Sequence, residues 1–236
     1  MVKLSNRLLA VASLVTDGNI LADVGTDHGY IPIYLVQEKR IHKAIAMDIN
    51  EGPLQRAKEH ISLYGLKDYI ETRLSDGAAA LTPGEVDTVL VAGMGGGLVM
   101  HILEEGKEVC MQAKELVLQP QSELERVRAY LWSNGYVILG EDMVLEDEKF
   151  YPMMRVAYQN VVDAESAENP LFCRYGKQLL EQKHTVLKEY LEREEKLYAG
   201  ILSNLLQTAV SEKTKERMAE VEVVLQLNRK ALSYFA

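Results

Sequence analysis

Two glycine-rich segments of this sequence each follow a short apolar run, and turns of this kind bind polar ligands. The first is Gly25-Thr26-Asp27-His28-Gly29, which follows the run Ile20 to Val24. The second is Gly93-Met94-Gly95-Gly96-Gly97, which follows the run Thr88 to Ala92. Where such a turn leads from a strand into a helix, its backbone N–H groups point at the polar part of a nucleotide-like ligand. The two segments therefore predict a site for such a ligand.

Asp27 limits which nucleotide-like ligand the first turn can bind. A dinucleotide fingerprint has a glycine at the position of Asp27, so that the backbone can approach a diphosphate. A carboxylate there would repel the diphosphate, and the sequence contains no G-x-x-x-x-G-K-[ST] phosphate loop. S-adenosylmethionine has no phosphate, and an acidic loop attracts its ammonium and sulfonium. The loop therefore favours S-adenosylmethionine as the cofactor.

Two further carboxylates follow the next apolar runs. Asp48 ends the run Ala44 to Asp48, 23 residues after Gly25, where an acidic residue accepts hydrogen bonds from ribose hydroxyls. Asp76 follows the run Ile70 to Leu74, where a carboxylate can accept from an adenine amino group. A single Asp at a strand end is more often a turn residue. Because the carboxyl ends of parallel strands share one edge, the residues in this order predict a single site.

Short apolar runs alternate with amphipathic segments, which predicts βαβ units and a mostly parallel sheet of an α/β fold. The capping-box pattern Ser122-Glu123-Leu124-Glu125 predicts a helix that ends at Asn134. No helix separates Tyr136 to Val144 from Met153 to Tyr158, so these should form an antiparallel hairpin at the sheet edge. The seven predicted strands are Ile20–Val24, Ala44–Asp48, Ile70–Leu74, Thr88–Ala92, Leu116–Gln119 and the two hairpin strands.

The pattern changes after Asn160. Val161 to Asn169 is polar and acidic, as in a linker, and two helical seams with apolar steps of three and four follow. The seams contain Leu180, His184, Leu187, Leu191, Glu194, Tyr198, Ile201 and Leu205, then Met218, Val221, Leu225, Asn228, Leu232 and Phe235. With a break near Ala209 to Ser211, they predict an antiparallel coiled-coil hairpin; intermolecular coiling is the alternative. The expected domains are residues 1–160 and 161–236.

Composition and charge exclude several classes of protein. The chain has 236 residues, is 47% hydrophobic and carries a net charge of −9, so a buried core is expected and full disorder is not. No apolar run approaches the roughly 20 residues that cross a bilayer. Met1 to Val15 is expected to be an amphipathic helix. Cys110 and Cys173 suit neither a disulfide framework nor a metal site, which predicts a cytoplasmic protein without a metal.

Four segments of the sequence resemble the TrmK family of bacterial tRNA adenine-N1 methyltransferases. They are Asp23-Val24-Gly25-Thr26-Asp27-His28-Gly29-Tyr30, Asp48-Ile49-Asn50, Ala92-Gly93-Met94-Gly95-Gly96 and Gln119-Pro120-Gln121. The resemblance covers the whole chain and implies a class I Rossmann-like methyltransferase domain joined to a C-terminal helical coiled coil. It also implies tRNA as the substrate and 1-methyladenosine in the D-arm region, at position 22, as the product.

Turn patterns and resemblance together define the predicted cofactor site. Its residues are Arg7, Asp23, Gly25, Thr26, Gly29, Asp48, Ile49, Asn50, Ser75, Asp76, Gly77, Gly93, Met94 and Gly95. Arg7 is either a surface cation or a lid contact to the methionine carboxylate. Met94 is expected to pack beneath the cofactor.

The predicted catalytic residues are Asp27, His28 and Tyr30. Enzymes that methylate exocyclic amino groups usually carry Asn/Asp-Pro-Pro-Tyr/Phe after the fourth strand, where this chain has Gly93-Met94-Gly95-Gly96. A ring nitrogen is therefore the expected target, and its methylation leaves a cationic base that Asp27 would stabilise. His28 and Tyr30 are candidates to stack on or orient an unstacked base. Alternatively, His28 caps a helix and Tyr30 packs against the sheet.

The charge of the chain is unevenly distributed. Residues 1–160 hold 15 basic and 23 acidic side chains, whereas residues 174–230 hold 11 and 9. A polyanion should therefore meet the C-terminal hairpin more readily. The predicted RNA-binding residues, expected to lie near one another, are Lys177, Lys183, Lys188, Arg193, Lys196, Lys213, Lys215 and Arg217. The competing interpretation is a solvated helix surface on a dimerisation device.

Two rival functions share these features. One is a methyltransferase that acts on a small molecule or a protein, because a fold does not determine the acceptor. The other is a non-catalytic adaptor that binds partners through the coiled coil, against which the intact Gly25, Asp48 and Asp76 argue. The chain is expected to be a monomer, with a homodimer as the alternative.

Overall fold

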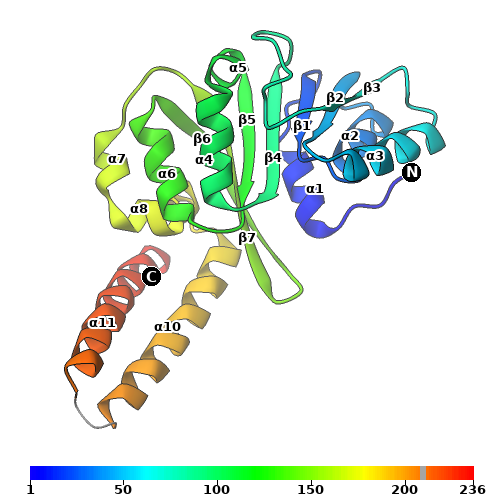
Figure 1. The fold of residues 1–236 in the computed structure, drawn as a ribbon. Coiled ribbons are helices and arrows are strands. Elements are labelled where there is room, and N and C mark those ends of the chain that lie inside the picture. Colours follow the sequence, from blue (N-terminus) through cyan, green and yellow to red (C-terminus); the bar gives the residue numbers. More distant parts are fainter. Residues whose placement is uncertain (208–210) are drawn as a thin grey trace.

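One seven-stranded β-sheet organises the molecule (Figure 1). The computed structural model describes residues 1–207 and 211–236. The strand order is β3-β2-β1-β4-β5-β7-β6, and strand pairs are parallel except those that β7 makes with β5 and β6. The strands are β1 (Ile20–Val24), β2 (Lys43–Asp48), β3 (Ile70–Leu74), β4 (Thr88–Met94), β5 (Glu115–Pro120), β6 (Tyr136–Glu146) and β7 (Lys149–Tyr158). The predicted α/β fold and edge hairpin are confirmed.

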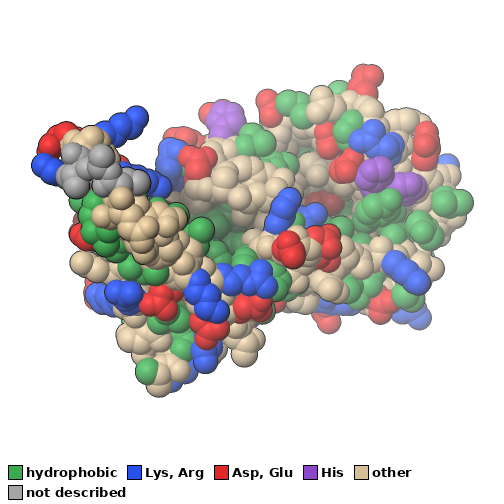
Figure 2. Space-filling view, turned by 90° about the horizontal axis from the view of Figure 1, so that it is seen from below, with side chains coloured by type: hydrophobic (Ala, Val, Ile, Leu, Met, Phe, Trp, Pro, Cys, Tyr) green, Lys and Arg blue, Asp and Glu red, His purple; other side chains and the backbone are tan. Residues whose placement is uncertain are grey.

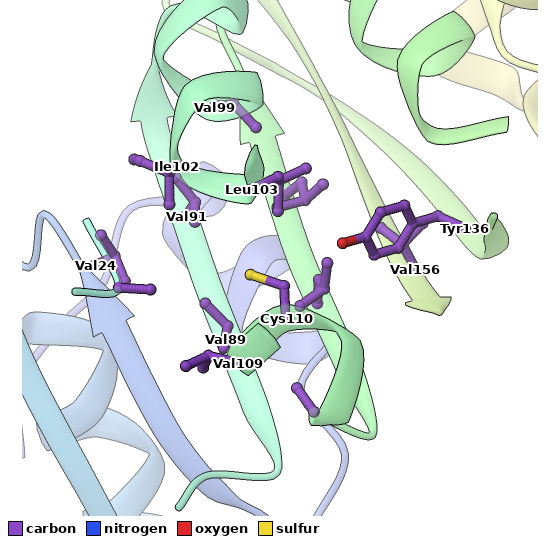
Figure 3. Close-up of a cluster of buried hydrophobic side chains, with 14 of the residues drawn as sticks. Val24, Val89, Val91, Val99, Ile102, Leu103, Val109, Cys110, Tyr136 and Val156 are labelled. Carbon is purple, nitrogen blue, oxygen red and sulfur yellow. The ribbon is translucent and has the colours of Figure 1, made fainter. Parts of the chain in front are cut away.

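Helices cover both faces of the sheet. Successive residues of a strand point to opposite faces, so the apolar strand residues contribute to a buried core on each side. Leu21 and Leu90 pack on the side of α1 (Asn6–Ser13), α2 (Tyr30–Gln37) and α3 (Glu51–Leu63). Val89 and Val91 pack on the side of α4 (Gly96–Glu105), α5 (Lys107–Gln112) and α6 (Leu124–Ser133). Figure 3 shows this second core, with Val91 of β4 near Ile102 of α4 and Val89 of β4 near Val109 of α5. Burial on both faces explains the continuous apolar runs in the central strands, Val89 to Val91 of β4 and Leu116 to Leu118 of β5.

The crevice for a ligand follows from the strand order. β1 pairs with β2 on one side and with β4 on the other. The chain leaves β1 for α2 on one face of the sheet and leaves β4 for α4 on the opposite face. Open α/β sheets bind ligands at the carboxyl ends of strands where the connections diverge in this way.

Five helices follow the sheet. They are α7 (Ala164–Glu168), α8 (Pro170–Tyr175), α9 (Lys177–Glu181), α10 (Thr185–Leu206) and α11 (Glu212–Leu232), before a short 3-10 turn at Ser233–Phe235. α10 and α11 pack together as a hairpin that extends from the end of the sheet where β1 and β4 end, whereas α5 lies at the opposite end (Figure 1). No helix in residues 1–207 or 211–236 is long and apolar enough to span a bilayer.

The two polar residues in the predicted seams contact each other inside the hairpin. Asn228 is fully buried, and its Nδ2 donates to Glu194 Oε2 at 2.9 Å and to the Leu191 carbonyl at 3.0 Å. Glu194 also accepts hydrogen bonds from Tyr175 Oη and Arg174 Nη2, both at 2.7 Å. These bonds satisfy the buried carboxylate and determine how α11 is aligned on α10. Most of the predicted break, Ala209 to Ser211, lies outside the described residues.

The predicted capping box before α6 is wrong. Glu123 precedes α6 with a φ of 53° and makes no side-chain cap bond. Instead, Ser122 Oγ accepts from the Gly96 N–H at 3.3 Å, and Glu123 Oε2 accepts from the Gly97 N–H at 2.9 Å. The two side chains therefore satisfy the N-terminus of α4 and not that of their own helix. The predicted end of the helix at Asn134 is confirmed.

Two predictions after Asn160 also need correction. The segment expected to be a linker contains α7, which is capped by Asp163 Oδ1 and packs on α6. The first long helix begins at Thr185 and not near Leu180, because Lys183 adopts a left-handed φ of 52°. Leu180 belongs to the separate helix α9. The division of the chain at residue 160 remains a proposal.

A buried ion pair joins α8 and α9 to the sheet domain. Arg128 Nε donates to Glu141 Oε1 at 2.8 Å, and the two side chains are 1% and 0% exposed. Arg128 Nη1 also donates to the carbonyls of Cys173 and Arg174, and Glu141 Oε2 accepts from the Gln178 N–H at 3.0 Å. Because these bonds replace the lost hydration, the pair is well satisfied.

Replacing Arg128 by Leu is expected to lower the free energy of unfolding by about 3 to 5 kcal/mol, because Glu141 would remain charged and buried without its partner. Urea denaturation followed by circular dichroism measures this change. The matched control is Arg126→Leu on the same helix, whose side chain is 68% exposed and whose loss should change stability by less than about 0.5 kcal/mol. Similar stabilities for the two variants would contradict the prediction.

Candidate active site

A hollow of about 370 Å³ opens at the carboxyl ends of β1 and β4. It is lined by Arg7, Leu8, Asp23, Gly25, Thr26, Asp27, His28, Tyr30, Ile31, Ala92, Gly93 and Gln121. Both glycine-rich turns predicted from the sequence thus contribute to one cavity. A wider hollow of about 760 Å³ lies between α3 and β3 and contains none of the predicted site residues. Its position at the outer edge of the sheet separates it from the crevice.

Asp23 places a buried carboxyl in the wall of the hollow. Only 4% of the residue is exposed, and Thr26 Oγ1 donates to its Oδ2 at 2.6 Å. Burial raises the pKa of Asp23 to about 7. Such a carboxyl gains most from a cation that enters the hollow, because the cation would offset the loss of hydration. The ammonium of S-adenosylmethionine fits this environment.

The affinity for S-adenosylmethionine is expected to rise with pH up to about 7 and then to level off. Below that pH the Asp23 carboxyl is protonated, so binding of an ammonium must release the proton, and affinity should fall up to about tenfold per pH unit. Calorimetry between pH 5 and 7.5, in two buffers of different ionisation enthalpy, measures both affinity and proton release. Asp23→Asn should bind weakly with a flat profile. A flat profile in the unmodified protein would show that Asp23 does not meet the ammonium.

The backbone of the first turn lies close to Met47 near the end of β2 and to the Met94 side chain. The N–H groups of Gly25 and Thr26 both donate to the Met47 carbonyl at 2.8 Å, and Gly25 has a left-handed φ of 73°. A Cβ on Gly25 would clash with the Met94 methyl carbon. Met94 therefore packs directly over this turn, which only glycine can form without displacing it.

The remaining predicted cofactor residues flank the hollow at neighbouring strand ends. Asp48 ends β2 and is 8% exposed, and its Oδ1 accepts from the Asn50 N–H at 2.9 Å, beside the exposed Ile49. Ser75 follows β3, and its Oγ donates to the Gly77 carbonyl. The neighbouring Asp76 is exposed. The remaining predicted residues, Gly29 and Gly95, immediately precede α2 and α4 as their N-cap residues. These groups lie at the same edge of the sheet but do not line the cavity.

Arg7 lies in the wall of the cavity. Its Nη1 donates to Gln119 Oε1 at 3.0 Å, and the same oxygen accepts from the Gly93 N–H at 3.2 Å. The guanidinium also lies 5.4 Å from the centre of the Tyr151 ring. Of the two interpretations of Arg7, this position favours a contact with an anionic group of the cofactor. Gln119 and Gln121 were absent from the predicted site, although Gln119-Pro120 ends β5 and Gln121 directly follows it.

The predicted catalytic residues meet at the mouth of the hollow. Asp27 has a left-handed φ of 51°, and its side chain is 56% exposed. His28 Nε2 lies 3.5 Å from Asp27 Oδ2. The rings of His28 and Tyr30 stack with centroids 5.1 Å apart and an interplanar angle of 9°. The His28 ring therefore lies between the Asp27 carboxylate and the Tyr30 ring in a continuous series of contacts.

Two residues of α3 complete this rim and were missed from the sequence. Arg56 Nη2 lies 2.8 Å from Asp27 Oδ1. The His60 ring stacks on Tyr30 at 5.2 Å, and its Nδ1 lies 3.0 Å from the His28 carbonyl oxygen. Both lie on one face of an amphipathic helix, where polar residues resemble an ordinary solvated surface. No pattern in the sequence distinguishes them.

The eight predicted RNA-binding cations fall into two groups. Lys177, Lys183, Lys188, Arg193 and Lys196 lie between the start of α9 and the middle of α10, whereas Lys213, Lys215 and Arg217 lie in the first turns of α11, at the far end of the hairpin. Leu206, the end of α10, lies ten residues beyond Lys196, about 15 Å along the helix. The expectation of one compact group is therefore corrected to two groups.

Several of these cations have acidic neighbours on the same helix. Arg193 pairs with Glu189 at 2.6 Å, Lys215 with Glu212 at 3.2 Å and Arg217 with Glu220 at 2.8 Å. Figure 2, which views the molecule from below, shows Lys and Arg mixed with Asp and Glu on the hairpin at the left. Exposed pairs of this kind are weak and can exchange an acidic partner for a phosphate. Among the described residues, no three His, Cys, Asp or Glu side chains gather as a metal site.

The sheet order, the glycine turn over a buried carboxyl and the acidic strand ends define a class I methyltransferase. Residues 4–154 match the family model described as a methyltransferase domain. Similarity to individual proteins extends further along the chain. The Bacillus subtilis tRNA (adenine(22)-N(1))-methyltransferase is 31% identical over 236 residues, which cover 98% of each chain. The chain belongs to the TrmK family of tRNA m1A22 methyltransferases.

Solved structures agree with this assignment. The B. subtilis m1A22 tRNA methyltransferase TrmK matches with a TM-score of 0.84 and 31% identity, over 98% of this chain and 100% of that chain. A putative tRNA (m1A22) methyltransferase from Streptococcus pneumoniae, in complex with S-adenosyl-L-methionine, matches with a TM-score of 0.84, 32% identity and the same coverage. TrmK of M. capricolum, in complex with S-adenosyl-homocysteine, matches with a TM-score of 0.82 and 28% identity over 99% of each chain.

Proposed function

We propose that this protein transfers a methyl group from S-adenosylmethionine to N1 of adenine 22 in tRNA. The observation that carries the proposal is similarity over the full chain, which includes the α10–α11 hairpin as well as the methyltransferase domain. A shared methyltransferase domain alone would leave the acceptor open. The hairpin is the part that a generic small-molecule methyltransferase does not need.

The residues of the hollow suit the cofactor. Asp23 would hold the ammonium, Arg7 the methionine carboxylate, and Asp48 the ribose hydroxyls. Gly25 and Gly93, both with left-handed φ values, let the backbone lie close to the ligand. When bound, the cofactor supplies an electrophilic methyl group on a cationic sulfur. The related structures with S-adenosyl-L-methionine and S-adenosyl-homocysteine support this assignment.

Chemistry at adenine N1 needs positioning more than a base. The N1 lone pair forms the bond to the methyl carbon as the carbon–sulfur bond breaks. The electron pair of the broken carbon–sulfur bond remains on sulfur. The adenine becomes cationic, so a carboxylate next to it stabilises the transition state. Asp27 is the exposed carboxylate at the mouth of the hollow. His28 and Tyr30 provide the flat surface against which an unstacked base can lie.

Transfer RNA contacts are proposed for both groups of cations on the C-terminal helices. Lys177, Lys183, Lys188, Arg193 and Lys196 would contact phosphates near the catalytic site, and Lys213, Lys215 and Arg217 would contact more distant ones. The hairpin extends from the same end of the sheet as the hollow (Figure 1), so one tRNA can meet both. Phosphate contacts of this kind supply affinity and not sequence preference.

The test is transfer of a labelled methyl group to tRNA transcripts. Nuclease digestion and mass spectrometry should find 1-methyladenosine in a transcript with adenine at position 22, and none in a matched transcript with guanine there. Bulk protein extract and small metabolites serve as competing acceptors. Label in either of those fractions, and none in tRNA, would support a different methyltransferase. Absence of label from every fraction would support the adaptor.

A further inference from the structure

Arg56 contacts the catalytic rim without lining the hollow. Its Nη2 lies 2.8 Å from Asp27 Oδ1, and its side chain is 46% exposed. Asp27, His28 and Tyr30 line the hollow, and Arg56 does not. The guanidinium therefore reaches the reaction site through the Asp27 carboxylate.

The direction of the Asp27 carboxylate depends on few contacts. In the described part of the chain its polar partners are Arg56 on Oδ1 and His28 Nε2, at 3.5 Å, on Oδ2. The loop that carries it is closed by Gly25 and Gly29, with left-handed φ values of 73° and 70°. The backbone conformation is thus determined by the loop, and the orientation of the carboxylate by Arg56 and His28.

α3 holds the same loop at a second point. His60 lies one turn after Arg56 and approaches the His28 carbonyl oxygen with its Nδ1, at 3.0 Å. Its ring stacks on both His28 and Tyr30, at 5.3 Å and 5.2 Å. One face of α3 therefore orients all three predicted catalytic residues. A half-exposed ion pair contributes little to stability. The Arg56 contact therefore matters for the orientation of the Asp27 carboxylate and not for the stability of the fold.

We propose that Arg56 is a positioning residue for methyl transfer, which directs the Asp27 carboxylate toward the mouth of the hollow. The proposal rests on the proposed function, in which Asp27 faces the adenine that becomes cationic. Misplacement of a reacting or stabilising group by about 1 Å can lower a rate about 100-fold. Loss of Arg56 therefore acts on the rate and leaves binding of the cofactor and of tRNA nearly unchanged.

A double-mutant cycle in the full-length protein tests this role. Arg56→Gln should lower kcat about 10- to 100-fold, with the KM for tRNA and the Kd for S-adenosylmethionine within about twofold of the unmodified protein. Asp27→Asn combined with Arg56→Gln should be no slower than Asp27→Asn alone, because Arg56 acts through Asp27. Arg56→Lys should restore most of the rate. Lys58→Gln, an exposed residue on the same helix, controls for helix content and net charge.

Three outcomes would overturn the proposal. An unchanged kcat in Arg56→Gln would show that Asp27 needs no orienting partner. Multiplicative effects in the double variant, with a raised KM for tRNA and a smaller salt dependence, would make Arg56 a phosphate contact. A parallel loss of cofactor affinity and melting temperature would make it a structural residue. Failure of the proposed function is separate, because the unmodified protein would then form no 1-methyladenosine in tRNA.

Discussion

Replacing Asp27 by Asn is expected to lower the rate of methyl transfer to tRNA about 100- to 1000-fold. Asn keeps the shape of the side chain but removes the charge, and the charge matters most when the adenine becomes cationic. Cofactor affinity should fall only modestly, because S-adenosylmethionine meets Asp27 at the mouth of the hollow and Asp23 in its buried wall. Single-turnover rates at saturating cofactor, with calorimetry for affinity, measure the two effects separately.

The matched control for this substitution is Asp17→Asn. Asp17 also forms an exposed ion pair with an arginine, with Arg40 Nε at 2.6 Å, but it precedes β1 and lies at the opposite end of the sheet from the hollow. Its replacement should leave the rate unchanged. Equal losses of rate and cofactor affinity in Asp27→Asn would instead make Asp27 a binding residue only.

Reversing the charge of Lys188, Arg193 and Lys196 to Glu is expected to weaken tRNA binding about 100-fold at physiological salt. All three side chains are exposed in the first twelve residues of α10. Each phosphate contact that is lost should reduce the slope of log affinity against log salt by about 0.9. Binding of tRNA measured across a salt series gives both values, and cofactor affinity should not change.

A control variant keeps the same change in net charge. Lys43, Lys107 and Lys114 are exposed at the amino ends of the strands and near α5, away from the hollow and the hairpin. Their replacement by Glu should reduce tRNA affinity far less than the hairpin variant does. Equal effects would mean that overall charge governs binding, and superimposable curves for the hairpin variant and the unmodified protein would show that α10 does not touch the RNA.

The strands and the glycine turns at the binding crevice could be predicted from sequence, because each depends on a pattern of a few neighbouring residues. Runs such as Val89 to Val91 are apolar at every position since both of their faces are buried. Gly25 and Gly93 mark turns because each adopts a left-handed φ. Asp48, at the end of the second predicted strand, followed from the same patterns and their order along the chain, whereas Asp23 followed from the resemblance to the TrmK family.

Contacts between residues that are distant in sequence could not be predicted. Ser122 and Glu123 match a capping box, yet they bond to Gly96 and Gly97 of another helix. That choice depends on where α4 and α6 meet, which no local pattern records. The interruption at Lys183, with its left-handed φ, likewise breaks a seam that looks continuous by periodicity.

The sequence by itself determined the class of fold, the acidic glycine loop that suits S-adenosylmethionine, and the helical hairpin with its two polar interruptions. Only the tertiary structure showed that Glu194 and Asn228 bond to each other, that the cations of the hairpin form two groups, and that Arg56 and His60 reach the loop of Asp27. The physical reason is that periodicity and turn chemistry act over a few residues. A polar side chain on a helix surface acquires a role only when packing places another segment within reach of it.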